Sequence, residues 1–297
     1  MIRIRYIMNK YWALKLVLEQ QSITKAAQIM SYSQPAVSQM LTSLEQELGF
    51  PLLNKQRQTL KLTKEGQAIY PFIVKLINDQ QALIDKQHEI TNQANRLIRI
   101  ATIPSISQQW LPELISAFQF QNPNVDFSII QGDNVSIPRL VENGDAELGI
   151  LNQDAAPDCD CEFLKEQTLR AVLPKSYPFS SDLNALNLAE LTKYPYILLE
   201  EGLHSESLSQ FKSAGLKPHI KMRLHDSFST LLMVEQGLGY TIMPVDQALD
   251  DHHQIRILPT SPIITRKIGI LSKNEILMTS AAEKFKKFVK KHAQELN

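Results

Sequence analysis

Two short helical patterns near the start of the chain are separated by only three polar residues, Ser31-Tyr32-Ser33. Ser22 stands in an N-cap position before the first pattern and Ser33 before the second, because a serine hydroxyl accepts a hydrogen bond from a free N–H of the first turn. Pro35 lies in the first turn of the second pattern, and Gly49 follows its last apolar residue. A helix that stops and restarts within three residues favours a helix-turn-helix.

The second helix is predicted to have one buried stripe and one polar face. The stripe consists of apolar residues three or four positions apart: Val37, Leu41, Leu44 and Leu48. The polar face and its start contain Ser33, Gln34, Pro35, Ser38, Gln39 and Thr42. Short, uncharged side chains of this kind suit base edges and phosphates in the major groove of DNA, and the alternative is an ordinary solvated face. Solvated faces usually carry Glu and Lys, which this face lacks before Glu45, so DNA binding is the favoured interpretation.

A small hairpin is predicted over 52–63, where Leu60 and Leu62 alternate with polar neighbours. Its tip carries Lys55, Arg57 and Lys61, which suit phosphates or the minor groove, and Arg57 is assigned to the flanking minor groove. The N-terminal part of the chain is therefore expected to be a winged helix-turn-helix.

The charge distribution agrees with a polyanion partner for the N-terminal part. The formal net charge of the 297 residues is zero, but residues 1–96 hold 12 Lys/Arg against 7 Asp/Glu, and residues 97–297 hold 19 against 24. No signal peptide and no apolar run long enough to span a membrane is expected, and two cysteines do not indicate a disulfide framework. The cytoplasm is the expected location, and Met8 is a second candidate for the initiator.

Four blocks of the sequence stand in the order and spacing of one known family: Ser22-Ile-Thr-Lys-Ala-Ala27, Ser33-Gln-Pro-Ala-Val-Ser38, Leu44-Glu-Gln-Glu-Leu-Gly49 and Leu62-Thr-Lys-Glu-Gly66. On these residues the chain resembles the LysR-type transcriptional regulators. Leu53-Asn54-Lys55 departs from the family pattern of Phe, an acidic residue and Arg. Lys55 keeps the positive charge of that arginine but lacks its planar fork.

A long helix is predicted from Thr63 to about Ala94. Apolar residues recur at spacings of seven, at Ile69, Leu76, Leu83, Ile90 and Leu97, as in a helix that pairs with a partner. Packing of the same leucines on the helix's own domain is the alternative. The resemblance implies a linker helix that joins DNA-binding heads into a homodimer or a homotetramer. The expected domains are a DNA-binding domain over 1–66 and a linker over 67–96.

Strands and helices alternate in residues 97–297, which predicts a parallel α/β sheet. The stretches 140–150 and 237–244 also resemble the family's effector domain, which has the two-lobed fold of periplasmic binding proteins. The resemblance implies lobe I over about 97–167 and 265–297, and lobe II over about 168–264. Glu147 stands where the family usually has Asp.

Ligands in such sheets collect beyond the carboxyl ends of the strands. The candidate effector-binding residues at these ends are Pro104, Ser105, Ile106, Gly132, His204, Ser227 and Phe228. By resemblance Ser105 would hold the effector, and its alternative role is a helix N-cap. Asp133 disfavours an anion unless it points away, and no arginine clamp is evident at these segments, so the charge of the effector stays open.

The function expected from the sequence is an effector-responsive, sequence-specific DNA-binding regulator of the LysR type. Duplex DNA, a second copy of the chain and a small-molecule effector are the expected partners, RNA polymerase is a further candidate, and a membrane is not expected. No cofactor is expected, and His252-His253 is not predicted to be a metal site.

Two rival functions stay open. One is an enzyme or a transport-type binding protein on the two-lobed fold, although no nucleophile–base pair or phosphate loop supports catalysis, so no enzyme is expected. The other is a redox-responsive regulator using Cys159 and Cys161, whose acidic neighbours Asp158, Asp160 and Glu162 are expected to raise the thiol pKa. Inert surface thiols are the favoured interpretation.

Overall fold

The computed structural model describes residues 2–54, 60–90, 97–179, 183–202, 204–245, 254–272 and 277–296. The chain divides into two compact units, Met1–Ala94 and Asn95–Asn297, which are described separately. None of the described helices is both long enough and apolar enough to cross a membrane.

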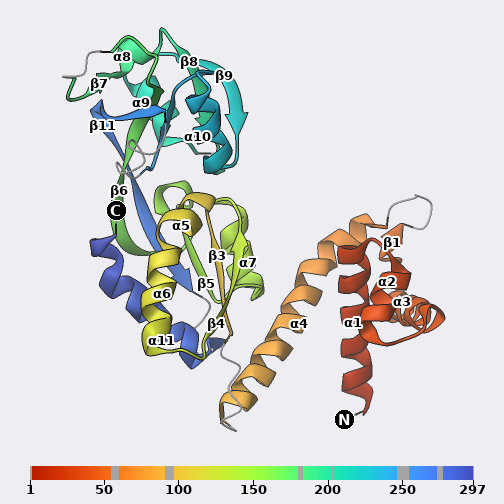
Figure 1. Ribbon diagram of the computed structural model, residues 1–297. Coiled ribbons are helices and arrows are strands. Elements are labelled where there is room, and N and C mark those ends of the chain that lie inside the picture. The colour runs from red at the N-terminus through yellow and green to blue at the C-terminus, as the bar shows by residue number, and fades with distance from the viewer. Residues whose placement is uncertain are drawn as a thin grey trace. The chain divides into compact units, whose positions relative to one another are not determined.

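The first unit contains four helices and a two-stranded ribbon within its described residues (Figure 1). In chain order these are α1 (Ile2–Gln20), α2 (Ile23–Met30), α3 (Gln34–Leu48), β1 (Leu53–Asn54), β2 (Lys61–Leu62) and α4 (Lys64–Ile90). The Ser22 hydroxyl accepts from Lys25 N and the Ser33 hydroxyl from Ala36 N, so both predicted N-caps are confirmed. Gly49 has a φ of 82°, the left-handed conformation predicted for the residue after α3. The first helix, α1, precedes the two predicted helices and begins at Ile2.

One apolar core holds α1, α2 and α3 together. Its fully buried residues include Leu14 and Val17 of α1, the close-packing Ala26 of α2, and Val37 and Leu44 of α3. The predicted stripe of α3 is therefore buried, with Leu48 only partly so.

The linker helix α4 has two apolar faces. Ile73 and Ile77 pack in the core of the first unit, whereas Leu76 and Leu83 are 50% and 70% exposed and Phe72 is 68% exposed. Packing of Leu76 and Leu83 on the helix's own domain, the alternative to a partner helix, is therefore wrong. The core of the first unit contains Ile73 and Ile77 of α4 instead. The apolar residues left exposed are spaced at four and seven positions, as a helix–helix seam requires.

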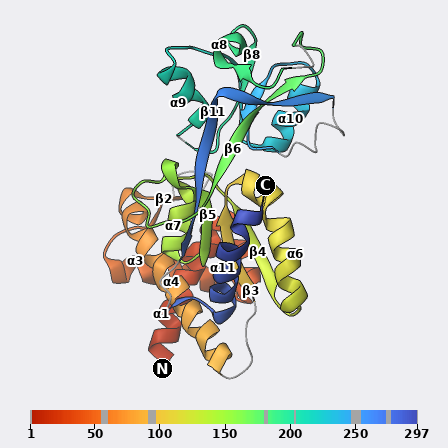
Figure 2. The ribbon, with the colours of Figure 1, turned by 90° about the vertical axis from the view of Figure 1, so that its left-hand side faces the viewer.

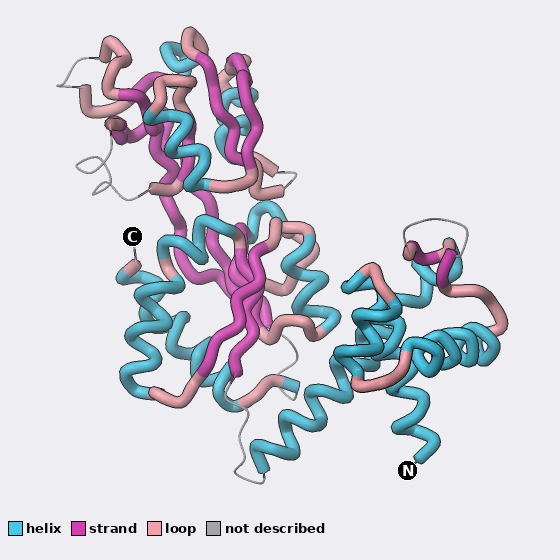
Figure 3. Tube along the Cα trace, turned by 45° about the vertical axis from the view of Figure 1, so that its right-hand side comes forward, coloured by secondary structure: helices cyan, strands magenta, loops and turns pink. Residues whose placement is uncertain are grey.

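The second unit is a two-lobed α/β structure (Figures 1 and 3). Lobe I contains β3 (Leu97–Thr102), α5 (Pro104–Gln109), α6 (Leu111–Gln121), β4 (Asp126–Gln131), α7 (Ser136–Asn143), β5 (Leu148–Asn152) and α11 (Ser280–His292). Lobe II contains β7 (Leu186–Asn187), α8 (Leu188–Leu191), β8 (Pro195–Leu199), α9 (Glu206–Ser213), β9 (His219–Leu224), α10 (Ser227–Glu235) and β10 (Thr241–Met243).

Two long strands, β6 (Glu162–Pro174) and β11 (Ile255–Ser272), run from one lobe into the other side by side (Figure 2). They pair antiparallel with each other, while β3 pairs parallel with β4 and β5. The predicted parallel pairing is therefore confirmed for β3, β4 and β5, and β6 and β11 make the sheet as a whole mixed. The buried core of lobe I comes from residues 98–164 and 268–296, and the two cores of lobe II come from 169–264. Gln167 and Arg266 are paired in register where the strands pass between these cores.

Candidate functional sites

The polar face of α3 is directed to solvent. Gln34, Gln39 and Thr42 are exposed and Ser38 is half-buried, with Gln34 Nε2 donating to Ser38 Oγ at 3.2 Å. Ser33 and Pro35 are exposed at the start of the helix. These six predicted residues therefore form one continuous polar strip, while Arg57 lies outside the described residues.

A carboxylate of α3 fixes the strand that follows the helix. Glu45 Oε1 accepts from Leu52 N at 2.8 Å and from Leu53 N at 3.1 Å, and Leu53 pairs with Leu62 across the ribbon. The position of the wing relative to α3 is therefore set by hydrogen bonds to Glu45, a role that the sequence pattern did not reveal.

A cavity of about 490 Å³ opens between the two lobes of the second unit. Lobe I supplies the ends of its strands to the wall, and lobe II supplies the segment after β8 and the residue after β9. The lining residues are Pro104, Gln131, Gly132, Asp133, Glu200, Glu201, Gly202 and His225. This cavity lies beyond the carboxyl ends of parallel strands, where α/β sheets bind ligands.

The structure gives the predicted effector residues different surroundings. Pro104 and Gly132 line the cavity. His204 lines a second cavity of about 20 Å³, together with Glu201 and Arg266. Ser227 is buried and Phe228 is 60% exposed, and neither lines these two cavities.

Ser105 and Ile106 lie behind the cavity wall. Ile106 is fully buried in the core of lobe I, so its side chain is part of the core and not of the cavity. Ser105 is also fully buried. The predicted alternative role as an N-cap is wrong, because the N-cap position of α5 is Ile103 and Ser105 lies inside the helix. Ser105 therefore has another function in the structure.

That function is a polar network around Arg266, a residue that the sequence did not single out. Arg266 Nη2 donates to Ser105 Oγ at 2.9 Å, and Arg266 Nη1 lies 2.5 Å from Glu201 Oε2. Gln167 Oε1 accepts from Nε at 3.0 Å and from Nη2 at 2.8 Å. The described strand-end segments themselves supply no arginine to this network. The guanidinium comes instead from β11, the strand that passes between the lobes, and Arg266 is 3% exposed.

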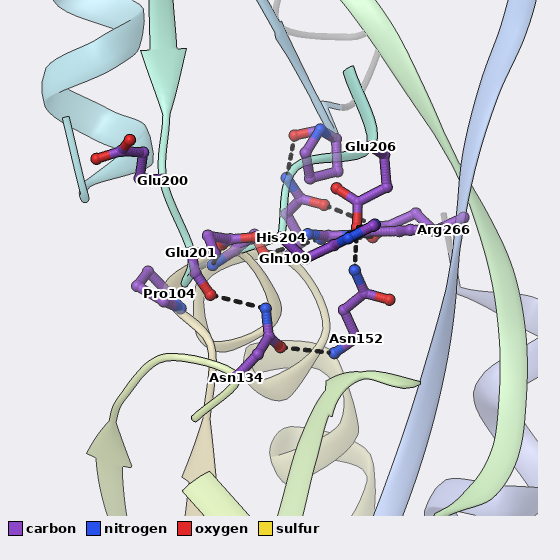
Figure 4. Close-up of polar contacts among 12 residues, drawn as sticks. Pro104, Gln109, Asn134, Asn152, Glu200, Glu201, His204, Glu206 and Arg266 are labelled. Carbon is purple, nitrogen blue, oxygen red and sulfur yellow. Dashed lines mark hydrogen bonds and ion pairs between the residues drawn. The ribbon is translucent and has the colours of Figure 1, made fainter. Parts of the chain in front are cut away.

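Backbone and amide groups also connect the lobes (Figure 4). The Glu201 carbonyl accepts from Asn134 N at 3.2 Å and from Asn134 Nδ2 at 2.7 Å. Gln109 Nε2 donates to Pro244 O at 2.8 Å, and Asn152 Nδ2 donates to Glu206 Oε1. The structure therefore shows lobes that are bridged by direct hydrogen bonds.

Asp133 lines the cavity as an ionised carboxylate that hydrogen bonds hold in place. Burial alone would raise its pKa, but hydrogen bonds from Ser136 and Val135 hold the pKa below its ordinary value. Both N–H groups bond to one oxygen, Oδ1, at 3.0 and 2.7 Å. The carboxylate therefore mainly caps the start of α7.

The two cysteines are half-buried against the core of lobe I, so their thiols are only partly accessible at the surface. Burial raises the pKa of Cys161 to about 11, with Cys159 and Asp160 adding to the effect. Burial is likewise the first cause of the raised pKa of Cys159, ahead of Asp158 and Glu142. Within the described part of the chain, no three His, Cys, Asp or Glu side chains gather as metal ligands would.

A winged helix-turn-helix joined to a two-lobed α/β unit with an inter-lobe cavity defines a DNA-binding regulator with an effector-binding domain. Two family models match the chain. Residues 8–67 match the bacterial regulatory helix-turn-helix protein of the lysR family, and residues 91–294 match the LysR substrate binding domain. The chain belongs to the LysR family of transcriptional regulators, and it is a DNA-binding transcription regulator with an effector-binding domain.

Individual relatives agree over nearly the whole length. The chain is 25% identical to the uncharacterized HTH-type transcriptional regulator YybE of Bacillus subtilis (strain 168) over 279 residues, which are 93% of this chain and 95% of YybE. The full-length LysR-family regulator CbnR, solved with its target DNA, superposes with a TM-score of 0.71 at 19% identity, covering 97% of this chain and 98% of CbnR. The effector-binding domain of QuiR in complex with shikimate superposes with a TM-score of 0.60 at 23% identity, covering 67% of this chain and 97% of that domain. At these identities the structural likeness shows the fold.

Proposed function

We propose that the polar strip of α3 reads DNA bases and that a small molecule in the inter-lobe cavity controls this binding. Gln34, Ser38, Gln39 and Thr42 would contact base edges in the major groove, and Arg57 would enter the flanking minor groove. The support is the contrast between the two faces of α3: the apolar stripe is buried and the exposed strip carries hydrogen-bonding groups without charge.

The observation that carries the effector proposal is the lining of the 490 Å³ cavity, which draws on both lobes. A ligand that touches both lobes binds one lobe arrangement better than another, and it shifts the population towards that arrangement by its difference in affinity. Gly132 and Pro104 on one side and Glu201 on the other would contact such a ligand.

The exposed seam of α4 supports a homodimer, and a homotetramer would follow from the pairing of two dimers. Leu76 and Leu83 would pack against the same residues of a second copy. Each copy supplies one α3, so a dimer would read two half-sites on one face of the DNA. We place this regulator in the cytoplasm, propose no catalytic activity for it, and regard RNA polymerase as a further partner.

The test uses the full-length protein and a DNA site selected from random sequence. Binding of that site is measured by fluorescence anisotropy at several salt concentrations and against a panel of small metabolites. A regulator loses affinity steeply as salt rises, and its effector changes the affinity or the DNA footprint. Gln131→Trp, which places a large ring at the cavity wall, should abolish the response to the effector while DNA binding persists. No selected site, or an effector response unchanged by Gln131→Trp, would contradict the proposal.

A further inference from the structure

The carboxylate of Glu201 is bound by groups outside its own segment, as the carboxylate of a ligand would be. Its Oε1 accepts from Ser105 N at 3.2 Å, and its Oε2 lies 2.5 Å from Arg266 Nη1. Glu201 itself belongs to the segment after β8 in lobe II. A carboxylate from one lobe therefore occupies a receptor made by a serine of the other lobe and an arginine of the connecting strand.

Hydrogen bonds within the protein hold this receptor, the Arg266 guanidinium and Ser105, in place without a ligand. Gln167 Oε1 and Ser105 Oγ accept from Arg266 and hold its guanidinium in one orientation, and Gln167 in turn donates to Gln109 Oε1 at 3.2 Å. A planar guanidinium matches the geometry of a carboxylate, and a buried one requires an anion close to it. Among the residues that line the two inter-lobe cavities, Arg266 is the only arginine or lysine.

Glu201 separates the receptor from the open cavity. It lines both the 490 Å³ cavity and the narrow one that contains Arg266, whereas Arg266 lines only the narrow one. A rotation of the Glu201 side chain into the large cavity would therefore expose Arg266 and Ser105 to a molecule held there. The neighbouring Glu200 is already paired with Arg223 and points away from Arg266 (Figure 4), so it does not compete for the receptor.

We propose that Glu201 is an internal ligand and that the effector is a carboxylate-bearing small molecule, whose carboxylate replaces that of Glu201 on Arg266 and Ser105. The exchange keeps one negative charge beside the buried guanidinium, so it avoids leaving that cation uncompensated. It also breaks a link between the lobes, which couples effector binding to their arrangement. This inference rests on the proposed function, because it names the chemical class of the molecule in the same cavity.

The test is a chemical rescue in the full-length protein, with acetate as the probe. Glu201→Ala removes a CH₂–carboxylate fragment, which is the size of acetate. Acetate, exchanged for chloride at constant ionic strength, should raise the unfolding midpoint of Glu201→Ala and bind it at least about tenfold more tightly than wild type, because the tethered competitor is gone. Acetamide, which has the same shape without the charge, should have no such effect.

Matched variants isolate the receptor. Glu200→Ala removes the adjacent carboxylate and should respond to acetate as wild type does. Glu201→Ala/Arg266→Met removes both charges of the pair and should lose the acetate response. Where Glu201→Ala fails to fold, Glu201→Gln keeps the shape of the side chain and is titrated in its place. Equal acetate binding by wild type and both Glu201 variants, or equal rescue by acetamide, overturns the internal-ligand assignment.

A second arm tests the effector class with the wild-type protein, using a panel of metabolite carboxylates and their amides. The expected hits are carboxylates, and Arg266→Lys should weaken them because it loses the planar fork. Neutral or cationic hits that Gln131→Trp abolishes would leave the proposed function standing and overturn the carboxylate inference. An effector response that Gln131→Trp leaves unchanged would instead overturn the proposed cavity function, whatever acetate does to the Glu201 variants.

Discussion

The ammonium group of Lys10 on α1 lies 2.6 Å from the Glu47 carboxylate of α3. Lys10 is 1% exposed and also donates to Ser43 Oγ at 2.8 Å, whereas the Glu47 side chain is 48% exposed. The contact ties α3, which carries the polar strip, to the first helix of the unit. Because the Glu47 carboxylate is partly exposed to solvent, it balances the charge of the buried Lys10 ammonium without being fully desolvated itself.

Replacing Glu47 should therefore loosen α3 without unfolding the second unit. We expect Glu47→Ala to reduce the local stability of α1 and α3 by about 1–2 kcal/mol, because a buried ammonium loses a counter-ion. Amide hydrogen exchange of the full-length protein, read by mass spectrometry, measures this loss helix by helix. Gln46→Ala is the matched control, since Gln46 is the exposed neighbour on the same helix. Equal protection in both variants would mean that the ion pair contributes nothing measurable.

The polar strip makes a distinct prediction about specificity. Gln34→Ala and Ser38→Ala should each weaken binding to the selected DNA site by about 1–3 kcal/mol and relax the preference at individual base positions. Binding to random DNA and its dependence on salt should stay unchanged, because these side chains carry no charge. Gln46→Ala is again the control for an exposed glutamine of α3. If the selected site is bound equally by all four proteins, the strip does not read bases.

The two faces of α4 predict opposite effects for neighbouring substitutions. Leu83→Asp should leave the helical content intact and shift the protein to monomers, because Leu83 is 70% exposed in the single chain. Ile77→Asp should instead destabilise the first unit by several kcal/mol, roughly the cost of a charge in a core site, since Ile77 is 1% exposed. Sedimentation velocity and circular dichroism together separate these outcomes. A dimer that survives Leu83→Asp would exclude the α4 seam as its interface.

The parts of the fold that were predictable from sequence depend on local chemistry. The hydroxyls of Ser22 and Ser33 meet N–H groups three residues away, and Gly49 takes a backbone conformation that glycine adopts at little cost. Such signals act within one helical turn, so a sequence pattern contains all of them. The boundaries of α2 and α3 were predictable for this reason.

The network around Arg266 was not predictable, because its partners are far apart in the chain. Glu201 lies 65 positions from Arg266 and Ser105 lies 161 positions away, and they meet only in the folded structure. The register of β6 with β11 adds Gln167 to the same network. Nothing in an alternating strand pattern distinguishes this arginine from an exposed one. The mixed sheet was not predictable for the same reason: β6 and β11 pair antiparallel over residues that are far apart in the chain, and local alternation of strands and helices does not indicate this pairing.

The cysteines give a final prediction, which concerns the redox alternative. With a pKa of about 11, Cys161 should have a thiolate fraction at pH 7.5 roughly 100-fold below that of an unperturbed thiol, and react with iodoacetamide correspondingly slowly. The raised pKa means that folding favours the neutral thiol. The alkylation rate should therefore rise about tenfold per pH unit until the pH approaches the pKa of Cys161. The contribution of the neutral thiol to folding stability should decrease as the pH rises above the pKa of a free thiol. Mass spectrometry of alkylated peptides gives the rate, and the same measurement in urea supplies the unfolded reference. Fast alkylation of the folded protein at pH 7 would contradict the burial of this thiol and restore a redox switch as the controlling chemistry.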